Sequence, residues 1–167
     1  MARSPADPVV AAWETSNRVT RYLVAEIPAA IWSARLPGAP TRSIRAIAAH
    51  LHNSRCSWIK TLGTEHGIAV PRHVDHRRVT KPQLLAALAR SSRGMVSLFR
   101  LGRARGGRVP PSKRYVWRNL SLELEHVLTY FVAHEAHHRG QILLAARQLD
   151  HRFSRDTLAG LWRWRNS

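Results

Sequence analysis

The residues most suited to chemistry lie in the segment His134-Glu135-Ala136-His137-His138, in the middle of the longest helical pattern of the chain. Two histidines four residues apart project from one face of a helix, about one turn apart. At that separation both imidazoles can reach one divalent metal ion. The spacing of His134 and His138 therefore indicates a metal site.

The two histidines and Glu135 lie on the face of this helix that carries its apolar residues. If successive residues are placed about 100° apart around the helix axis, that face also contains Val127, Leu128, Phe131, Ile142 and Ala145. An ionisable group that is buried without a partner is destabilised or changes its protonation state. Two explanations are open: a bound cation, or a hydrogen-bonded network among core histidines.

A metal held by two histidines needs further ligands, because catalytic sites usually have three protein ligands and an open position. The second helical segment offers His50 and His52. They flank the apolar stripe of that helix on opposite sides, so the helical geometry does not choose between them. Cys56 lies well around the helix from His50, and we expect it to be a small buried hydrophobic residue rather than a ligand.

Four long segments have the periodicity of amphipathic helices, and no stretch alternates convincingly with the period of a strand. Prolines and glycines separate the segments. The third segment opens on Thr80-Lys81-Pro82-Gln83, which combines a capping box with a proline in the first turn. The predicted helices cover residues 8–27, 43–62, 80–102 and 119–149, with a short terminal helix within residues 154–164.

Helices of this number and length predict an all-α fold, a four-helix bundle, in which metal sites are built from side chains on facing helices. The connections after the second and third helices have about 15 to 18 residues, which is enough to cross the bundle. We therefore expect long crossover connections rather than assuming a simple up-and-down order. A chain of 167 residues fits one domain, residues 1–167.

The composition excludes several classes of protein. One cysteine cannot form an internal disulfide, no apolar run approaches the ~18 residues of a membrane span, and no signal-peptide pattern is present, so we expect a cytoplasmic protein. The formal net charge of +17 would attract polyanions nonspecifically. The basic residues are scattered and no nucleic-acid-binding motif accompanies them, which favours codon usage in a GC-rich genome as the cause of the arginine excess.

Two segments of the sequence resemble the DinB family of bacterial four-helix-bundle metalloproteins. One is Ala48-Ala49-His50-Leu51, followed by Trp58; the other runs from His134 to Ile142 and contains His-His-Arg-Gly-Gln-Ile. The resemblance implies a divalent metal ion, commonly nickel or zinc, bound by one histidine of the second helix and two of the fourth. In this chain the implied ligands are His50, His134 and His138.

The resemblance also implies a class of activity. Characterised members of the family include S-transferases and isomerases that use low-molecular-weight thiols, so a metal-dependent transferase of that kind is expected. A hydrolase is the alternative among enzymes, because a metal with open positions also activates water. A second hypothesis is a noncatalytic metal-binding or stress-response protein, acting as a homodimer through an exposed helix face. A third is a basic protein associated with nucleic acid.

Glu135 is the candidate catalytic residue, since zinc proteases place a general base between two helical histidines. The downstream sequence argues against a protease: a metzincin requires glycine and histidine where this chain has Gln141 and Leu144. Glu135 is predicted to accept a proton beside metal-bound water, to fix an imidazole, or to be buried with a hydrogen bond to an arginine or tyrosine. We expect Gln141 to hydrogen-bond behind a ligand and His137 to lie at the surface.

Overall fold

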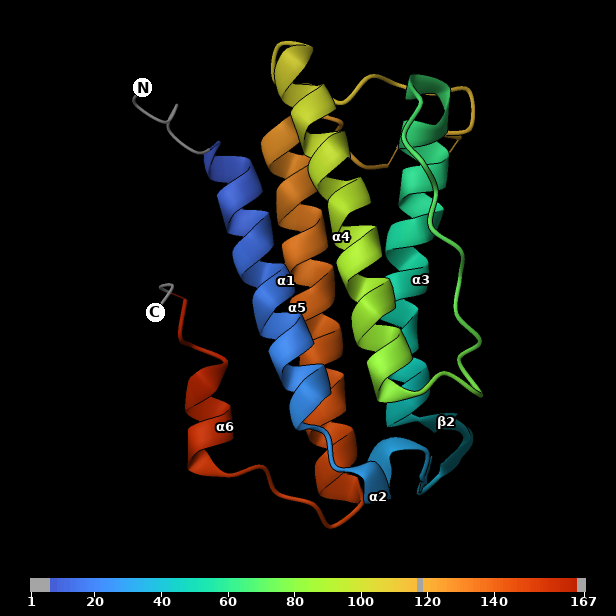
Figure 1. Ribbon diagram of the computed structural model, residues 1–167, viewed down its shortest axis with the longest axis vertical. Helices are drawn as coiled ribbons and strands as arrows, with labels where there is room; N and C mark the ends of the chain where they lie inside the picture. The colour runs from blue at the N-terminus through green and yellow to red at the C-terminus, as the bar shows by residue number, and fades with distance from the viewer. Residues whose placement is uncertain (1–6, 117–118, 165–167) are drawn as a thin grey trace.

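Four long helices form the body of the protein in the computed structural model, which describes residues 7–116 and 119–164. The helices are α1 (Pro8–Glu26), α3 (Ile44–Gly63), α4 (Lys81–Ala104) and α5 (Leu124–Gln148), and they pack side by side (Figure 1). Short elements complete the described chain: α2 (Ala29–Trp32), a 3-10 turn at Thr64–His66, and α6 (Arg155–Gly160). The predicted helical bundle with a short C-terminal helix is confirmed.

Side-chain caps fix where three of the long helices begin. The Asp7 carboxylate accepts from the Val9 amide, and the Ser43 hydroxyl accepts from the Ala46 amide. Thr80 and Gln83 form the predicted capping box, in which each side chain accepts a hydrogen bond from the other residue's backbone amide. Because each cap satisfies an amide that has no partner inside the helix, it stabilises the helix at that residue.

The fourth long helix begins later than predicted, at Leu124 rather than near residue 119. The residues around Leu122 pair instead with the start of the connection that follows α4: the Val109 amide donates to the Leu122 carbonyl over 2.8 Å, and the Leu124 amide donates to the Gly107 carbonyl over 2.8 Å. These hydrogen bonds pair the backbone N–H and C=O groups of residues 122–124 outside a helix. The partners are distant in sequence, so the local pattern did not predict the pairing.

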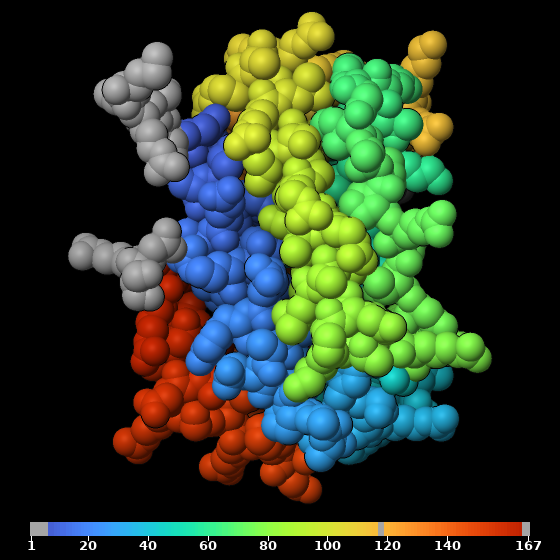
Figure 2. All heavy atoms as spheres, in the orientation of Figure 1, coloured from blue at the N-terminus to red at the C-terminus, as the bar shows by residue number. Residues whose placement is uncertain are grey.

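The connection of α3 to α4 crosses the length of the bundle, whereas the connection of α4 to α5 stays at one end (Figure 1). As a result α3 and α4 run parallel, and α5 runs antiparallel to both. Contacts between neighbouring helices place α1 against α4 and α5, and α3 against α4 and α5. The space-filling view shows α1 and α4 covering one face, with α6 at the edge beside α1 (Figure 2).

A small antiparallel hairpin, β1 (Arg35–Leu36) with β2 (Ala39–Ser43), precedes α3 and was not predicted. The segment Pro37-Gly38-Ala39-Pro40 has the composition of a turn. Gly38 adopts a φ of 71°, a left-handed conformation that glycine tolerates and that closes the hairpin. Strands this short have no alternation long enough to detect in the sequence.

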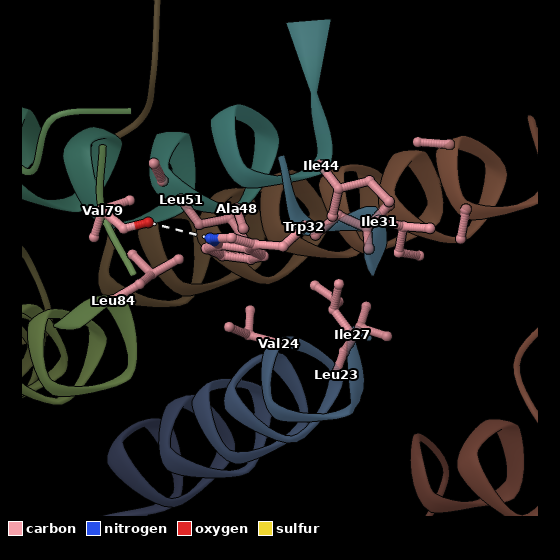
Figure 3. Packing of buried hydrophobic residues seen from close by; sticks show 14 of the residues in the cluster. Leu23, Val24, Ile27, Ile31, Trp32, Ile44, Ala48, Leu51, Val79 and Leu84 are labelled. Atoms are coloured by element: carbon pink, nitrogen blue, oxygen red, sulfur yellow. Dashed lines mark hydrogen bonds between the residues drawn. The ribbon is translucent and has the colours of Figure 1, made fainter. Parts of the chain in front are cut away.

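The apolar side chains form two buried clusters, one toward each end of the bundle. In the cluster nearer the hairpin, the Trp32 ring lies among aliphatic side chains of α1, α3 and α4, and its Nε1 donates to the Val79 carbonyl over 3.1 Å (Figure 3). In the other cluster Trp13 packs edge-on against Phe99 and Phe131. Polar residues of α1, α3 and α5 lie between the two clusters and form the region described next.

No helix within residues 7–116 and 119–164 is both long enough and apolar enough to cross a bilayer.

Candidate metal centre

Three histidines from two helices converge on one side of the bundle. His50 lies on α3, and His134 and His138 lie one turn apart on α5. One ring nitrogen from each lies within 4.8 Å of those of the other two. The antiparallel packing of α3 against α5 therefore brings together the three residues that the sequence resemblance implied as ligands.

The spacing of the imidazoles suits a shared cation. The Nε2 atoms of His134 and His138 are 3.1 Å apart. Two nitrogen ligands on one zinc-like ion, each about 2.0–2.1 Å from it, lie about 3.3 Å apart at the tetrahedral angle, close to the separation of these two atoms. The His50 ring is close to both, with centroid distances of 5.4 Å to His134 and 4.6 Å to His138. The donor set and its spacing therefore fit a divalent metal ion.

The electrostatics favour neutral, metal-competent rings. Burial and the nearby histidines lower the pKa of His134 to about 4. Burial also lowers the pKa of His50 and of His138, and neighbouring positive charge adds to this effect, including that of Arg42 on His138. An imidazole binds metal through an unprotonated nitrogen, so at neutral pH all three rings can act as ligands.

Gln141 orients one of the three rings. Its Oε1 lies 2.8 Å from His138 Nδ1, and its Nε2 lies 2.9 Å from Nε2 of the exposed His137. With Gln141 Oε1 as acceptor, His138 carries its proton on Nδ1 and presents the Nε2 lone pair to His134 and His50. The predicted hydrogen bond of Gln141 is therefore present, to His138, and His137 lies at the surface as predicted.

Aromatic residues border the histidines on the side away from the hairpin. The Tyr130 ring stacks on His134 with a centroid distance of 5.9 Å and an interplanar angle of 15°. Trp58, which belongs to the family-like segment of α3, packs edge-on against Tyr130 at 5.4 Å. These two residues also line a cavity of about 360 Å³ with Asn119 and Leu120. Tyr130 is therefore shared by the cavity lining and the aromatic border of His134.

Glu135 points into the core and is 1% exposed. Its Oε1 accepts from Arg55 Nε over 2.6 Å and its Oε2 accepts from Thr20 Oγ1 over 2.8 Å, so both carboxylate oxygens have buried donors. The hydrogen bond to an arginine is therefore present. A catalytic role for Glu135 stays a prediction, and its contacts are those of a residue that joins helices.

Arg55 is the important residue that the sequence analysis missed. It is 1% exposed, donates to Asn17 Oδ1 and to the Leu88 carbonyl, and lies 4.8 Å from the centroid of the Trp13 ring. The available signal was its position four residues after Leu51 in the apolar stripe of α3. An arginine in that stripe requires a buried acceptor, and Glu135 supplies the negative charge.

His52, the other candidate of the second helix, lies away from the cluster. Its ring is fully buried, with Nδ1 3.0 Å from Ser91 Oγ and Nε2 2.9 Å from the Arg72 carbonyl. It is a core histidine with both nitrogens engaged. Cys56 is buried beside it, as expected, and burial raises the pKa of the thiol to about 11.

These features define a class: a helical-bundle protein with three histidines, from neighbouring antiparallel helices, placed to hold a metal ion. The family comparison agrees, because the model of the DinB family matches residues 2–159. The chain belongs to the DinB family. In comparisons with curated proteins and with solved structures, nothing matches.

Proposed function

We propose that the protein binds a divalent metal ion, nickel or zinc, through His50, His134 and His138, and that it is a metal-dependent enzyme. The observation that carries the proposal is the convergence of three imidazole nitrogens within 4.8 Å of one another. A cation held there supplies Lewis-acid activation of water or of a thiol at an open coordination position. Three histidine ligands with open positions are typical of catalytic rather than structural sites.

The burial of the three histidines supports a metal site that small molecules can reach from solvent. His50 is exposed, so the cluster opens to solvent on the α3 side, whereas His134 and His138 are partly buried. Gln141 fixes His138, and the stacked Tyr130 ring covers one face of His134. An aromatic border of this kind excludes water from one side and leaves the other side for substrate.

Within the enzyme class, we propose a transferase that uses a low-molecular-weight thiol, with a hydrolase as the alternative. Family membership and the cavity bordered by Trp58 and Tyr130 support this choice. The lowered pKa values of the histidines keep the ligands available near neutral pH.

Elemental analysis of tag-free protein, purified without added metal or chelator, tests the metal site. We expect near-stoichiometric nickel or zinc in the wild type and its loss in His50→Ala and His134→Ala variants that remain folded. His126→Ala is the matched control, because His126 is an exposed histidine of α5 outside the cluster and should leave the metal content unchanged. Folded wild-type protein that takes up no metal even after reconstitution would refute the proposal.

The thiol hypothesis has its own test. Cobalt-substituted protein should give a saturable absorption change with a low-molecular-weight thiol, and His134→Ala protein should give none. A thiol that causes no change at a fully loaded site, while the site still hydrolyses an activated ester, would favour the hydrolase.

A further inference from the structure

A second cavity, of about 540 Å³, lies where the hairpin, the start of α3 and the crossover connection meet. Arginines from all three segments line it. Arg35 comes from β1, Arg42 from β2, Arg45 from the first turn of α3, and Arg77 from the crossover connection, with His76 beside it. Three arginines within residues 35–45 and one from the distant crossover connection thus place four positive charges around one hollow.

None of these four guanidinium groups has an anionic partner among residues 7–116 and 119–164. They form no ion pair and donate no side-chain hydrogen bond within those residues, and the lining of the cavity contains no acidic residue. The Nε atom of Arg45 is shielded from solvent and still lacks an acceptor. Arginines elsewhere in the protein, such as Arg55 and Arg103, are paired with carboxylates.

This arrangement favours a multiply charged anion. Like charges around a concave surface repel one another and raise the local positive potential, and a bound anion relieves that repulsion. The planar guanidinium presents paired N–H donors that match phosphate oxygens. The first turn of α3, which contributes Arg45 and Ala46 to the lining, adds the positive end of a helix dipole.

We propose that this cavity binds a small molecule carrying a diphosphate or triphosphate group. Four guanidiniums contributed by three segments can contact several phosphoryl groups at once, whereas a single phosphate would leave much of the positive charge uncompensated. The volume lies within the range of small-molecule pockets, roughly 300–1,000 Å³. Its concave shape, rather than an extended basic face, favours such a ligand over a nucleic-acid strand.

The site adjoins the histidine cluster without depending on it. Ala46 in the cavity wall precedes His50 by one turn of α3, about 6 Å along the helix axis. A phosphorylated ligand anchored by the arginines would therefore reach toward the cluster. Binding by the arginines needs no metal, so the two proposals can fail separately.

Isothermal titration calorimetry with sodium tripolyphosphate, in about 150 mM salt to screen weak surface attraction, tests the proposal. The test variant is Arg42→Gln/Arg77→Gln. The matched control is Arg100→Gln/Arg105→Gln, which removes the same charge from two exposed arginines at the opposite end of the molecule. We expect saturable binding that weakens roughly tenfold or more in the test variant and stays near wild type in the control.

Further variants and ligands test the same site. Arg45→Gln should weaken binding without a large change in unfolding, and His134→Ala should bind tripolyphosphate as wild type does. Orthophosphate should bind more weakly than tripolyphosphate. Equal losses in both double variants would show nonspecific attraction and overturn the proposal, as would an absence of binding. Binding of a single-stranded oligonucleotide that tripolyphosphate does not displace would overturn it in favour of nucleic acid.

Discussion

At the scale of single residues, the candidate metal site depends on how each imidazole is turned. The contact of Gln141 Oε1 with His138 Nδ1 selects the tautomer in which Nε2 is free, and the stacked Tyr130 ring limits rotation of His134. Keeping the three histidines would therefore not be enough to keep the metal affinity if their rings were free to turn. The residues behind the ligands should contribute measurably to metal affinity.

Replacing Gln141 with leucine should weaken metal binding about 10- to 100-fold, because His138 loses the acceptor that fixes its ring. Gln141→Glu keeps an acceptor oxygen at the same position and should retain most of the affinity. Competition against a chelator of known affinity measures the effect. Leu144→Ala, at an exposed position of the same helix, serves as the control, and an equal loss there would contradict the assigned role of Gln141.

The lowered histidine pKa values predict how stability depends on pH in metal-free protein. Between the ordinary histidine pKa of about 6.5 and the lowered value of about 4 for His134, the unfolded chain binds more protons than the folded chain. The free energy of unfolding should therefore be highest above pH 6.5 and fall as the pH decreases toward 4. Denaturant unfolding across this range should show a shallower dependence in His134→Gln; an unchanged slope would contradict the expectation.

At the scale of elements, one buried ionic network joins all four long helices. Glu135 of α5 accepts from Arg55 of α3 and Thr20 of α1, and Arg55 donates in turn to Asn17 of α1 and to the Leu88 carbonyl of α4. The network lies next to His134 in sequence, so it also fixes the turn of α5 that carries the histidines. Glu135 is the counter-charge of the buried Arg55, and its Oε2 also lies 3.9 Å from Arg139 Nη1, so the buried charges are compensated.

Removing only one charged partner of this network should lower the free energy of unfolding strongly. Glu135→Leu leaves the Arg55 charge buried without a counter-charge, and the free energy of unfolding should fall by about 3–5 kcal/mol. The double variant Glu135→Leu/Arg55→Met removes both charges and should lose less than the sum of the single changes, as measured by denaturant unfolding. If Glu135→Gln unfolded like wild type but abolished activity, a catalytic role would be favoured over this structural one.

At the scale of the whole molecule, a metal ion on the three histidines would cross-link α3 to α5. These helices neighbour each other in space but are separated in sequence by the crossover connection and α4. A ligand that binds only the folded state stabilises it in proportion to the logarithm of its concentration. Metal binding should therefore be visible in global unfolding as well as at the site.

Added zinc or nickel at about 100 times its Kd should raise the free energy of unfolding by about 2.7 kcal/mol. His50→Ala leaves two ligands on a single helix, so the cross-link is absent and the increase should largely disappear. Denaturant unfolding with increasing metal measures both, with His126→Ala as the control. A similar increase in wild-type and His50→Ala protein would mean that the stabilising ion binds elsewhere.

The sequence by itself determined the helices and two of the three histidines of the candidate site. Apolar periodicity, the Thr80 capping box and the prolines and glycines between segments are local signals, and the helices follow them. His134 and His138 could be paired from sequence because both lie on one helix, whose geometry fixes their separation. The family-like segments identified His50 as the third histidine, a choice that helical spacing alone left open.

Tertiary structure decided everything that depends on how different helices meet. Whether His50 or His52 faces α5 depends on the rotation of α3 about its axis, and packing sets that rotation by burying Leu51 and Arg55. The Arg55–Glu135 pair and the arginine-lined cavity join residues separated by tens of positions, so no local pattern records them. The chain encodes these contacts only through the complete fold, because the free energy that selects them comes from burying all the helices together.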